Sequence, residues 1–288
     1  MSTASQQRTS GGPKRAPAKA AAAVLLAAGA VVFFVCAFRT DLAQVSYTVS
    51  SAKVTRPVRL ALVTDLHSCD YGRGQETLLA ALAQLRPDAV LLGGDIVDDE
   101  LPREPALAFL SAAAARYPCF YVSGNHEYRS GDIEGILQQV RACGATVLAG
   151  ETAALTLNGQ AVFISGVDDP AGGTAQFDAQ LARVSPHAGQ GLSVLLTHRP
   201  EYAERYRSYG FDVVLAGHAH GGQWRIPGLL NGLLAPNQGL FPRYAGGSYG
   251  LGDTTMVVSR GLARESTRIP RIFNRPELVL VEIVPQGA

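Results

Sequence analysis

The feature that most constrains the fold is a short apolar run that recurs five times between residues 58 and 216. A short run that is apolar throughout is typical of a strand buried on both faces. The runs lie at 58–64, 89–92, 120–122, 192–196 and 213–216, and segments with helical spacing follow four of them, at 75–85, 104–116, 133–142 and 200–209. Strands that alternate with helices predict an α/β fold with largely buried sheets.

The rest of the chain supports one folded body. Asn158 and Gly159 separate apolar runs at 155–157 and 161–164, which is the strongest short hairpin signal in the sequence. The segments 256–259 and 278–284 are typical of closing strands. Because no stretch midway reads as a linker, we expect a single domain from residue 58 to residue 288.

Polar side chains of the kinds that bind metals follow each of the five apolar runs. In open α/β sheets the carboxyl ends of the strands border one crevice, so we expect these groups to converge although they are distant in the chain. Each motif alone is more often a turn or a satisfied polar residue, but five in order favour a common site. They are Asp65 and His67, then Asp95 and Asp98, then Asn125 and His126, then His198, and finally His218 and His220.

The spacing within two of these motifs carries a further argument. In extended backbone, side chains at i and i+2 point to the same side, so Asp65 with His67, and His218 with His220, can face one site. Small neighbours such as Gly217 let the backbone approach that site closely. Carboxylate and imidazole without thiolate suit manganese, iron or zinc, so we expect divalent metal ions, with manganese favoured.

The N-terminal part is a separate piece. Residues 1–19 have no acidic residue and are rich in Ser, Gly, Pro, Ala and basic residues, which predicts a disordered cytoplasmic tail. Residues 20–38 are uncharged and long enough to span a bilayer, so we expect a transmembrane anchor, with a cleaved signal peptide as the alternative. Residues 39–57 form the expected linker and lead-in. Because the basic residues lie before the anchor, we expect everything downstream of the anchor to lie outside the cytoplasm.

The five motifs, taken in order, resemble those of the calcineurin-like metallophosphoesterases. The resemblance covers nearly all of residues 58–284. Four shorter stretches are similar to the membrane-anchored bacterial phosphodiesterases of the YkuE and YaeI type. The family motifs read Asp65-x-His67, Gly94-Asp95-x-x-Asp98, Gly124-Asn125-His126-Glu127, His198 and Gly217-His218-x-His220, and the shorter stretches are GVDDP at 166–170, THRPEY at 197–202, GHAHGGQ at 217–223 and RPELVLVEI at 275–283.

This resemblance implies a fold and a role for each residue. The fold is a four-layer α/β/β/α sandwich, here preceded by one transmembrane helix, and it carries a centre of two divalent metal ions. In that centre His126 faces the substrate and is oriented by Asp98. The metal ligands implied are Asp65, His67 and His220 for the first ion, Asp95 as the bridge, and Asn125, His198 and His218 for the second ion.

The chemistry of these residues agrees with those roles. Two cations about 3.5–4 Å apart can share the carboxylate of Asp95, activate a bridging hydroxide and clamp the phosphoryl oxygens of an in-line displacement. His126 can stabilise the transition state or protonate the leaving oxygen. Since neither ligand set includes a nucleophilic side chain, we expect direct attack by the hydroxide without a phosphoenzyme.

The segment 223–252 is Gly-rich and apolar, and it is the part of the sequence that bears on the substrate. It is either a lip that touches membrane or acyl chains, or a cover for the sheet edge and the core. Arg225 and Arg243 within it, and Asp169 before it, are candidate substrate contacts, although the Asp-Asp-Pro stretch at 168–170 is equally consistent with a turn.

Two classes of function remain at this point. The first is a phosphodiesterase or pyrophosphohydrolase acting on a membrane lipid or cell-envelope phosphate ester, with a phosphomonoesterase as its runner-up. The second is a non-catalytic metal-binding interaction module, which the presence of both Asn125 and His126 argues against. The formal net charge of +1 gives no field that recruits nucleic acid, and we expect a monomeric catalytic domain.

Overall fold

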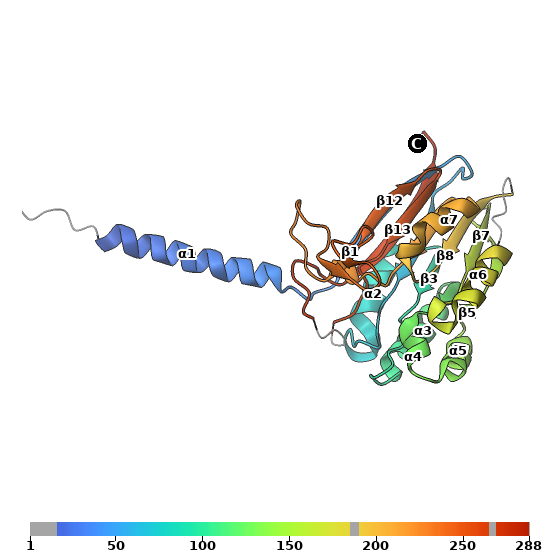
Figure 1. The fold of residues 1–288 in the computed structure, drawn as a ribbon, viewed down its shortest axis with the longest axis horizontal. Coiled ribbons are helices and arrows are strands. Elements are labelled where there is room, and N and C mark those ends of the chain that lie inside the picture. Colours follow the sequence, from blue (N-terminus) through green and yellow to red (C-terminus); the bar gives the residue numbers. More distant parts are fainter. Residues whose placement is uncertain (1–15, 185–189, 265–268, 288) are drawn as a thin grey trace, which may run out of the picture.

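The computed structural model describes residues 16–184, 190–264 and 269–287. Helix α1 (Ala16–Ala37) projects from the body as an isolated rod (Figure 1). Its part Ala20–Ala37 is long and apolar enough to cross a membrane, and very little of it is covered by the rest of the chain. The helix begins within the expected tail of residues 1–19, of which residues 1–15 lie outside the described part.

Two six-stranded sheets form the body of the described chain. The strands expected from the five apolar runs are all present, and those that are neighbours in one sheet run parallel to each other. The first of them, 58–63, also pairs in antiparallel with the strand at 277–285. The first sheet has the order β1 (Ala43–Ser51), β14 (Glu277–Pro285), β2 (Val58–Val63), β3 (Ala89–Gly93), β4 (Cys119–Val122) and β5 (Thr146–Val147). The second has the order β12 (Gly247–Leu251), β13 (Thr254–Val258), β9 (Val213–Ala216), β8 (Leu192–Leu196), β7 (Gln160–Gly166) and β6 (Glu151–Leu157).

Three apolar clusters define four layers. The inner cluster joins the two sheets face to face, with Leu60 and Leu62 of β2 on one side and Val194 and Leu196 of β8 on the other. The outer face of the first sheet is covered by α2 (Glu76–Leu85), α3 (Glu104–Ala114) and α5 (Ile133–Ala142), and that of the second by α6 (Thr174–Arg183) and α7 (Ala203–Tyr209). The expected α/β/β/α sandwich is therefore confirmed (Figure 1).

The hairpin predicted at Asn158 and Gly159 joins β6 to β7. Both residues have positive φ, 51° and 78°, as a two-residue turn between right-twisted strands requires. Asn158, with a short polar side chain, and Gly159, with none, both tolerate a positive φ.

Strand β1 lies within residues 39–57, which we expected to be a linker and lead-in. It pairs in parallel with β14 at the edge of the first sheet, from Ala43 opposite Glu277 to Ser51 opposite Pro285. Most of its residues are at least partly exposed. A half-exposed edge strand carries little apolar signal, which is why the sequence pattern did not reveal it.

Two adjacent leucines of α2 test how the helix holds the first sheet. Leu78 is fully buried, whereas Leu79 is only partly buried against the same cluster. We expect Leu78→Ala to lower the free energy of unfolding by about 2–5 kcal/mol because a cavity remains, and Leu79→Ala to lower it by clearly less. Thermal unfolding of the two variants in detergent provides the measurement. Equal losses would show that α2 does not pack as described.

Candidate metal centre

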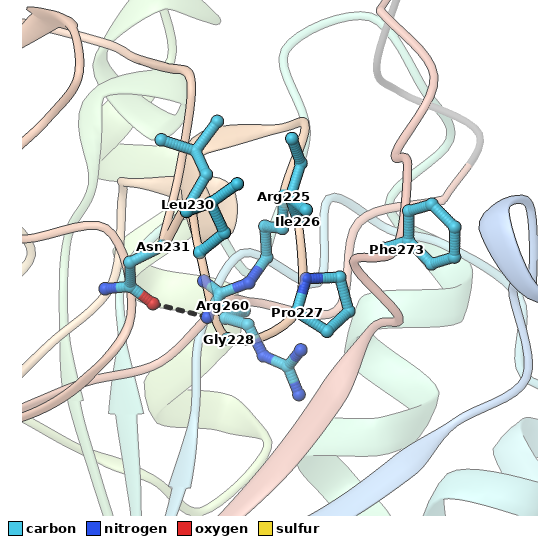
Figure 2. Close-up of a pocket in the computed structure, with 9 residues that line it drawn as sticks. Arg225, Ile226, Pro227, Gly228, Leu230, Asn231, Arg260 and Phe273 are labelled. Carbon is cyan, nitrogen blue, oxygen red and sulfur yellow. Dashed lines mark hydrogen bonds between the residues drawn. The ribbon is translucent and has the colours of Figure 1, made fainter.

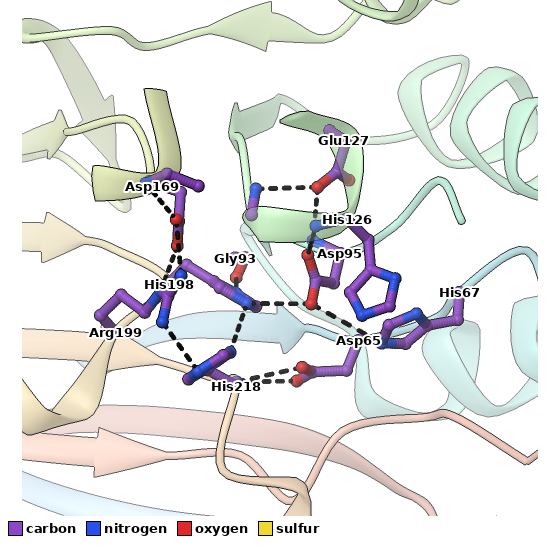
Figure 3. A network of polar contacts seen from close by, with 12 residues as sticks. Asp65, His67, Gly93, Asp95, His126, Glu127, Asp169, His198, Arg199 and His218 are labelled. Carbon is purple, nitrogen blue, oxygen red and sulfur yellow. Dashed lines mark hydrogen bonds and ion pairs between the residues drawn. The ribbon is translucent and has the colours of Figure 1, made fainter. Parts of the chain in front are cut away.

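The polar residues that follow the five apolar strands converge at one edge of the two sheets (Figure 3). Within each of two buried groups, one ligand-type atom per residue lies within 4.8 Å of the others. The strands deliver these residues at their carboxyl ends, so the predicted convergence is confirmed. The first group is Asp65, His67 and His220, and the second is Asp95, His198 and His218.

The backbone of these residues differs from our expectation. We predicted extended backbone with side chains at i and i+2 on one side, but the chain turns sharply at these positions. Left-handed backbone is costly for residues other than glycine and gathers at functional sites, so the turns, rather than the pleat of a strand, aim the side chains at the centre. The φ angles are 51° at Asp65, 48° at His67, 51° at Asp95, 65° at His218 and 46° at His220.

The carboxylate of Asp95 lies between the two groups. Its Oδ2 is 3.1 Å from Nε2 of His198 and 3.7 Å from Nε2 of His67. Among the described residues neither this oxygen nor Nε2 of His67 has a hydrogen-bond partner, although both are buried. Burial would raise the pKa of Asp95, but His198 and His67 beside it hold that pKa well below its usual range. An ionised, buried oxygen that lies between imidazoles of both groups fits a bridging metal ligand.

Hydrogen bonds fix which nitrogen of two imidazoles faces the centre. Nδ1 of His198 lies 2.8 Å from the carbonyl oxygen of Gly93, and Nδ1 of His67 lies 2.8 Å from Oδ2 of Asp98. Each of these two contacts places a proton on the outer nitrogen and directs the inner nitrogen to the centre, as in histidines that bind metals. Nε2 of His218 lies 2.9 Å from Oδ1 of Asn237 and 3.0 Å from Nη1 of Arg199, an acceptor and a donor, so these contacts do not fix the tautomer of His218.

The amide of Asn125 and the imidazole of His218 supply a second test of metal fit. The amide oxygen is directed toward Nδ1 of His218 at 2.9 Å, so two lone pairs face each other unless the amide is rotated. Nδ1 of His218 is also 3.1 Å from Nε2 of His198. With metal–ligand bonds of about 2.1 Å, two ligands at right angles lie about 3.0 Å apart. These spacings therefore suit a cation held by all three side chains.

The imidazoles differ in charge. Burial and the neighbouring charges of His198 and Arg199 lower the pKa of His218 well below its usual range, and burial with His67 does the same for His220. Burial opposes the proton of His198, but Asp95 raises its pKa to about 10. Metal ligands must be deprotonated, so a cation bound here would displace the proton of His198.

The structure corrects the role expected for Asp98. We expected Asp98 to orient His126, but its Oδ2 lies 3.7 Å from Nδ1 of His126 and only 2.8 Å from Nδ1 of His67. The neighbouring Asp99 contacts Nδ1 of His126 instead, at 2.5 Å. The reason is that the chain turns after β3, so that consecutive carboxylates reach two different rings. His126 is partly exposed, and its ring packs edge-on against that of His67.

Glu127 of the Gly124–Glu127 motif, to which we gave no role, organises the turns behind the centre. Its buried carboxylate accepts hydrogen bonds from the backbone N–H groups of residues 95, 96, 97 and 124, and from the hydroxyl of Tyr121. Helix α4 (Asn125–Arg129) carries this side chain together with Asn125 and His126. Burial and the nearby Asp95 raise the pKa of Glu127 to about 7. One carboxylate thus joins the ends of β3 and β4.

A charged pair that the sequence did not reveal borders the second group. The guanidinium of Arg199 contacts both carboxylate oxygens of Asp169, at 2.5 and 2.8 Å, and donates to Oδ1 of Asn237 at 2.6 Å. Asp169 also accepts the N–H of Ala171, so the turn at Asp-Asp-Pro is present. The carboxylate of Asp169 therefore holds Arg199 rather than facing a substrate directly. Arg199 lies in the quoted stretch 197–202, whereas nothing marked Asn237.

The two arginines expected as substrate contacts lie away from the two groups. Arg243 is exposed, pairs with Glu204 and stacks over the ring of Tyr244. Arg225 donates to the carbonyl of Gly221 and to Asn231. It lines a pocket of about 430 Å³ with the residues drawn in Figure 2, which shows the segment 225–231 curled beside Phe273.

Comparison with known proteins agrees with this centre. Residues 58–222, which include all seven expected metal ligands, match the family of calcineurin-like phosphoesterases. The uncharacterised metallophosphoesterase YkuE of Bacillus subtilis is 28% identical over 232 residues, which cover 77% of each chain. The phosphodiesterase YaeI of Escherichia coli is 30% identical over 239 residues, covering 79% of this chain and 83% of that protein.

A vertebrate relative is similar over a smaller part of its length. A transmembrane protein with a metallophosphoesterase domain from Danio rerio is 26% identical over 219 residues, covering 69% of this chain and 47% of that protein. The family match over more than half of the chain, together with two buried groups of Asp and His side chains that can hold metal ions, establishes the class of protein. The chain belongs to the calcineurin-like phosphoesterase family and is a metal-dependent phosphoester hydrolase.

Proposed function

We propose that this protein is a membrane-anchored phosphodiesterase or pyrophosphohydrolase that uses two divalent metal ions to cleave a phosphate ester of a membrane lipid or of the cell envelope. The observation that carries the reaction type is the buried Oδ2 of Asp95, which lies between imidazoles of both groups of ligand-type side chains. The name of YaeI, a phosphodiesterase, supports a diester as substrate.

In this proposal each group of side chains holds one ion. Asp65, His67 and His220 hold the first, Asn125, His198 and His218 hold the second, and Asp95 bridges them. Two divalent cations supply neutralisation of phosphate charge and acidify the attacking water. Oxygen and nitrogen ligands without thiolate suit manganese, iron or zinc, with manganese favoured. Since only Asp65 and Asp95 carry negative charge in this set, the loaded centre keeps a net positive charge for an anionic substrate.

The other side chains act on the substrate or on the ligands. His126 is the partly exposed imidazole beside the first group, so it can protonate the leaving oxygen or stabilise charge in the transition state. Asp99 contacts Nδ1 of His126. Nη1 of Arg129 lies 3.2 Å from Nε2 of His126, where its positive charge favours the binding of an anionic substrate. Arg199, held by Asp169, keeps Asn237 against His218.

The apolar surface beside α1 supports a substrate in the membrane. Phe273 packs against Phe33 of α1 with ring centroids 5.3 Å apart, and its N–H donates to the carbonyl of Ala37. Trp224 pairs with Ile272 and donates to the carbonyl of Pro270, which places the segment 223–241 on the same side. Large exposed apolar patches mark interaction surfaces. The exposed apolar side chains of this side are Trp224, Ile226, Leu229, Leu234, Leu240, Phe241 and Ile269.

The same segment reaches the proposed metal centre. The strands β10 (Leu234–Ala235) and β11 (Gly239–Leu240) form a short hairpin, and Asn237 lies at its turn. Leu240 is on the exposed apolar surface. Asn237, three residues before Leu240, contacts His218. A lip that touches the bilayer and the centre at once suits a substrate whose ester lies at the membrane surface. In this proposal the surface lies outside the cytoplasm, which the basic residues before α1 favour.

A comparison of two soluble substrates tests the reaction class. We expect the full-length protein with manganese to hydrolyse bis(p-nitrophenyl) phosphate with a kcat/KM at least tenfold above that for p-nitrophenyl phosphate, because the proposed substrate is a diester. Release of p-nitrophenol gives both values. A reversed preference would identify a phosphomonoesterase, and hydrolysis of neither compound with any of the three metals would favour a binding module.

Two substitutions separate metal binding from proton transfer. Asp95→Asn removes the charge that the two ions share, so we expect it to lose metal and turnover together. His126→Ala leaves all seven ligands in place, so we expect it to keep the metal while kcat falls about 10²–10⁴-fold, the usual contribution of a general acid. Elemental analysis and diester hydrolysis measure the two effects. Normal turnover by His126→Ala would remove His126 from the reaction.

The adjacent carboxylates Asp98 and Asp99 form a matched pair. Asp98 orients His67, a proposed ligand, so Asp98→Asn is expected to weaken metal affinity about 10–100-fold. Asp99 orients His126, so Asp99→Asn is expected to keep metal affinity and to lower kcat. Metal titrations followed by rate measurements at saturating metal distinguish the variants. If Asp98→Asn lowered kcat with metal affinity intact, Asp98 would be the partner of His126 after all.

A further inference from the structure

A buried arginine without a partner lies beside the first group of ligands. The side chain of Arg271 is 7% exposed, and its Nε, Nη1 and Nη2 have no hydrogen-bond partner among the described residues. A buried charge is costly unless it is paired and hydrogen-bonded, so such a guanidinium calls for an anion. Arginine is also the residue that best matches the oxygens of a phosphate group.

The described carboxylates that act on Arg271 do not pair with it. Asp65 and Glu277 favour its charge from a distance, whereas Arg260 opposes it. Both oxygens of Asp65 accept the N–H of His218, and Glu277 is occupied by the backbone and guanidinium of Arg260. Burial, the largest effect, lowers the pKa of Arg271. Arg271 therefore supplies positive charge here without a matching negative group among the described residues.

Arg271 lines a pocket of about 260 Å³ at the base of the anchor helix. Part of its wall is Phe38 and Thr40, the residues that directly follow α1, and another part is Arg264. The guanidinium of Arg264 lies over the ring of Tyr71, 4.8 Å from its centroid. None of the seven proposed metal ligands lines this pocket. Arg264 and Arg271 thus lie where the chain leaves the proposed membrane span.

We propose that this pocket binds the phosphate group of a membrane lipid, with Arg271 as the direct contact and Arg264 at the rim. The position of the pocket selects the source of the phosphate. An apolar helix that spans the hydrocarbon core ends at the level of the lipid headgroups, and Phe38 and Thr40 follow its last turn. This site is separate from the metal centre and rests on the membrane span of α1, not on catalysis.

Native mass spectrometry of the full-length, metal-loaded protein released from dodecyl maltoside micelles tests the proposal. The probes are dioleoyl phosphatidic acid and dioleoylglycerol, which differ only in the phosphate group. We expect the wild-type protein to retain phosphatidic acid in preference, and Arg271→Gln to raise its apparent Kd at least tenfold, since one charge-assisted contact is lost. Asp95→Asn is expected to lose the metal, so the same loss caused by Arg271→Gln in that background would assign it to the pocket and not to the metal ions.

Two further variants keep the test decisive. Arg116→Gln removes an exposed positive charge after α3 and is the matched control, which should bind phosphatidic acid as the wild type does. Thr40→Glu adds a carboxylate at the exposed wall of the pocket and should weaken binding even if Arg271→Gln fails to fold. Thermal unfolding checks the fold of each variant.

The contrary outcomes are distinct. Equal binding of phosphatidic acid by the wild type and by folded Arg271→Gln would overturn the proposal, and so would unchanged binding by Thr40→Glu. Equal retention of dioleoylglycerol would show that the acyl chains alone are recognised. If soluble glycerol 3-phosphate bound as tightly as phosphatidic acid, the source would not be the membrane. None of these readouts involves turnover. Failure of the lipid-phosphate proposal would therefore leave the proposed hydrolase intact, and a protein without hydrolase activity could still bind phosphatidic acid at this pocket.

Discussion

The fold depends on one buried carboxylate group placed between two sheets. Asp95 ends a strand of the first sheet, yet its Oδ2 lies closest to His198, which follows a strand of the second. Two buried faces that pack only through apolar side chains can slide or tilt, but a charged oxygen shared by imidazoles from both sheets fixes their edges against each other. Cations at this position would neutralise a charge that only the neighbouring imidazoles balance among the described residues.

The local backbone is organised around the same point. Left-handed residues at the strand ends bring strain, and the carboxylate of Glu127 offsets it by collecting four backbone N–H groups from two loops. Gly124 is required between them, since a Cβ there would lie 2.2 Å from Oδ1 of Asp95. The motif Gly124–Glu127 therefore combines a ligand, a substrate-facing imidazole and the scaffold that holds both.

Much of the fold and of the centre could be predicted from the sequence, because buried parallel strands leave continuous apolar runs and their polar ends stand out against them. The half-exposed strand β1 carries no such signal. The exchange of Asp98 for Asp99 as the partner of His126 depends on a turn of the chain, which spacing alone does not reveal. Asn237 was beyond reach because it arrives from a hairpin whose own residues read only as apolar lip.

In the proposed arrangement the hairpin and the buried arginine would give the domain two separate contacts with the membrane. Leu240 and Phe241 would meet the bilayer surface, and the same hairpin carries Asn237 to His218. A displacement of the lip would therefore alter the contact between Asn237 and Nε2 of His218. The pocket of Arg271 lies at the base of α1 instead, where it can hold the domain at a fixed height. A bound headgroup would then fix the distance of the domain from the bilayer, while the lip stays free to follow the bilayer surface. Contact of the lip with the bilayer would affect the metal centre through the side-chain amide of Asn237.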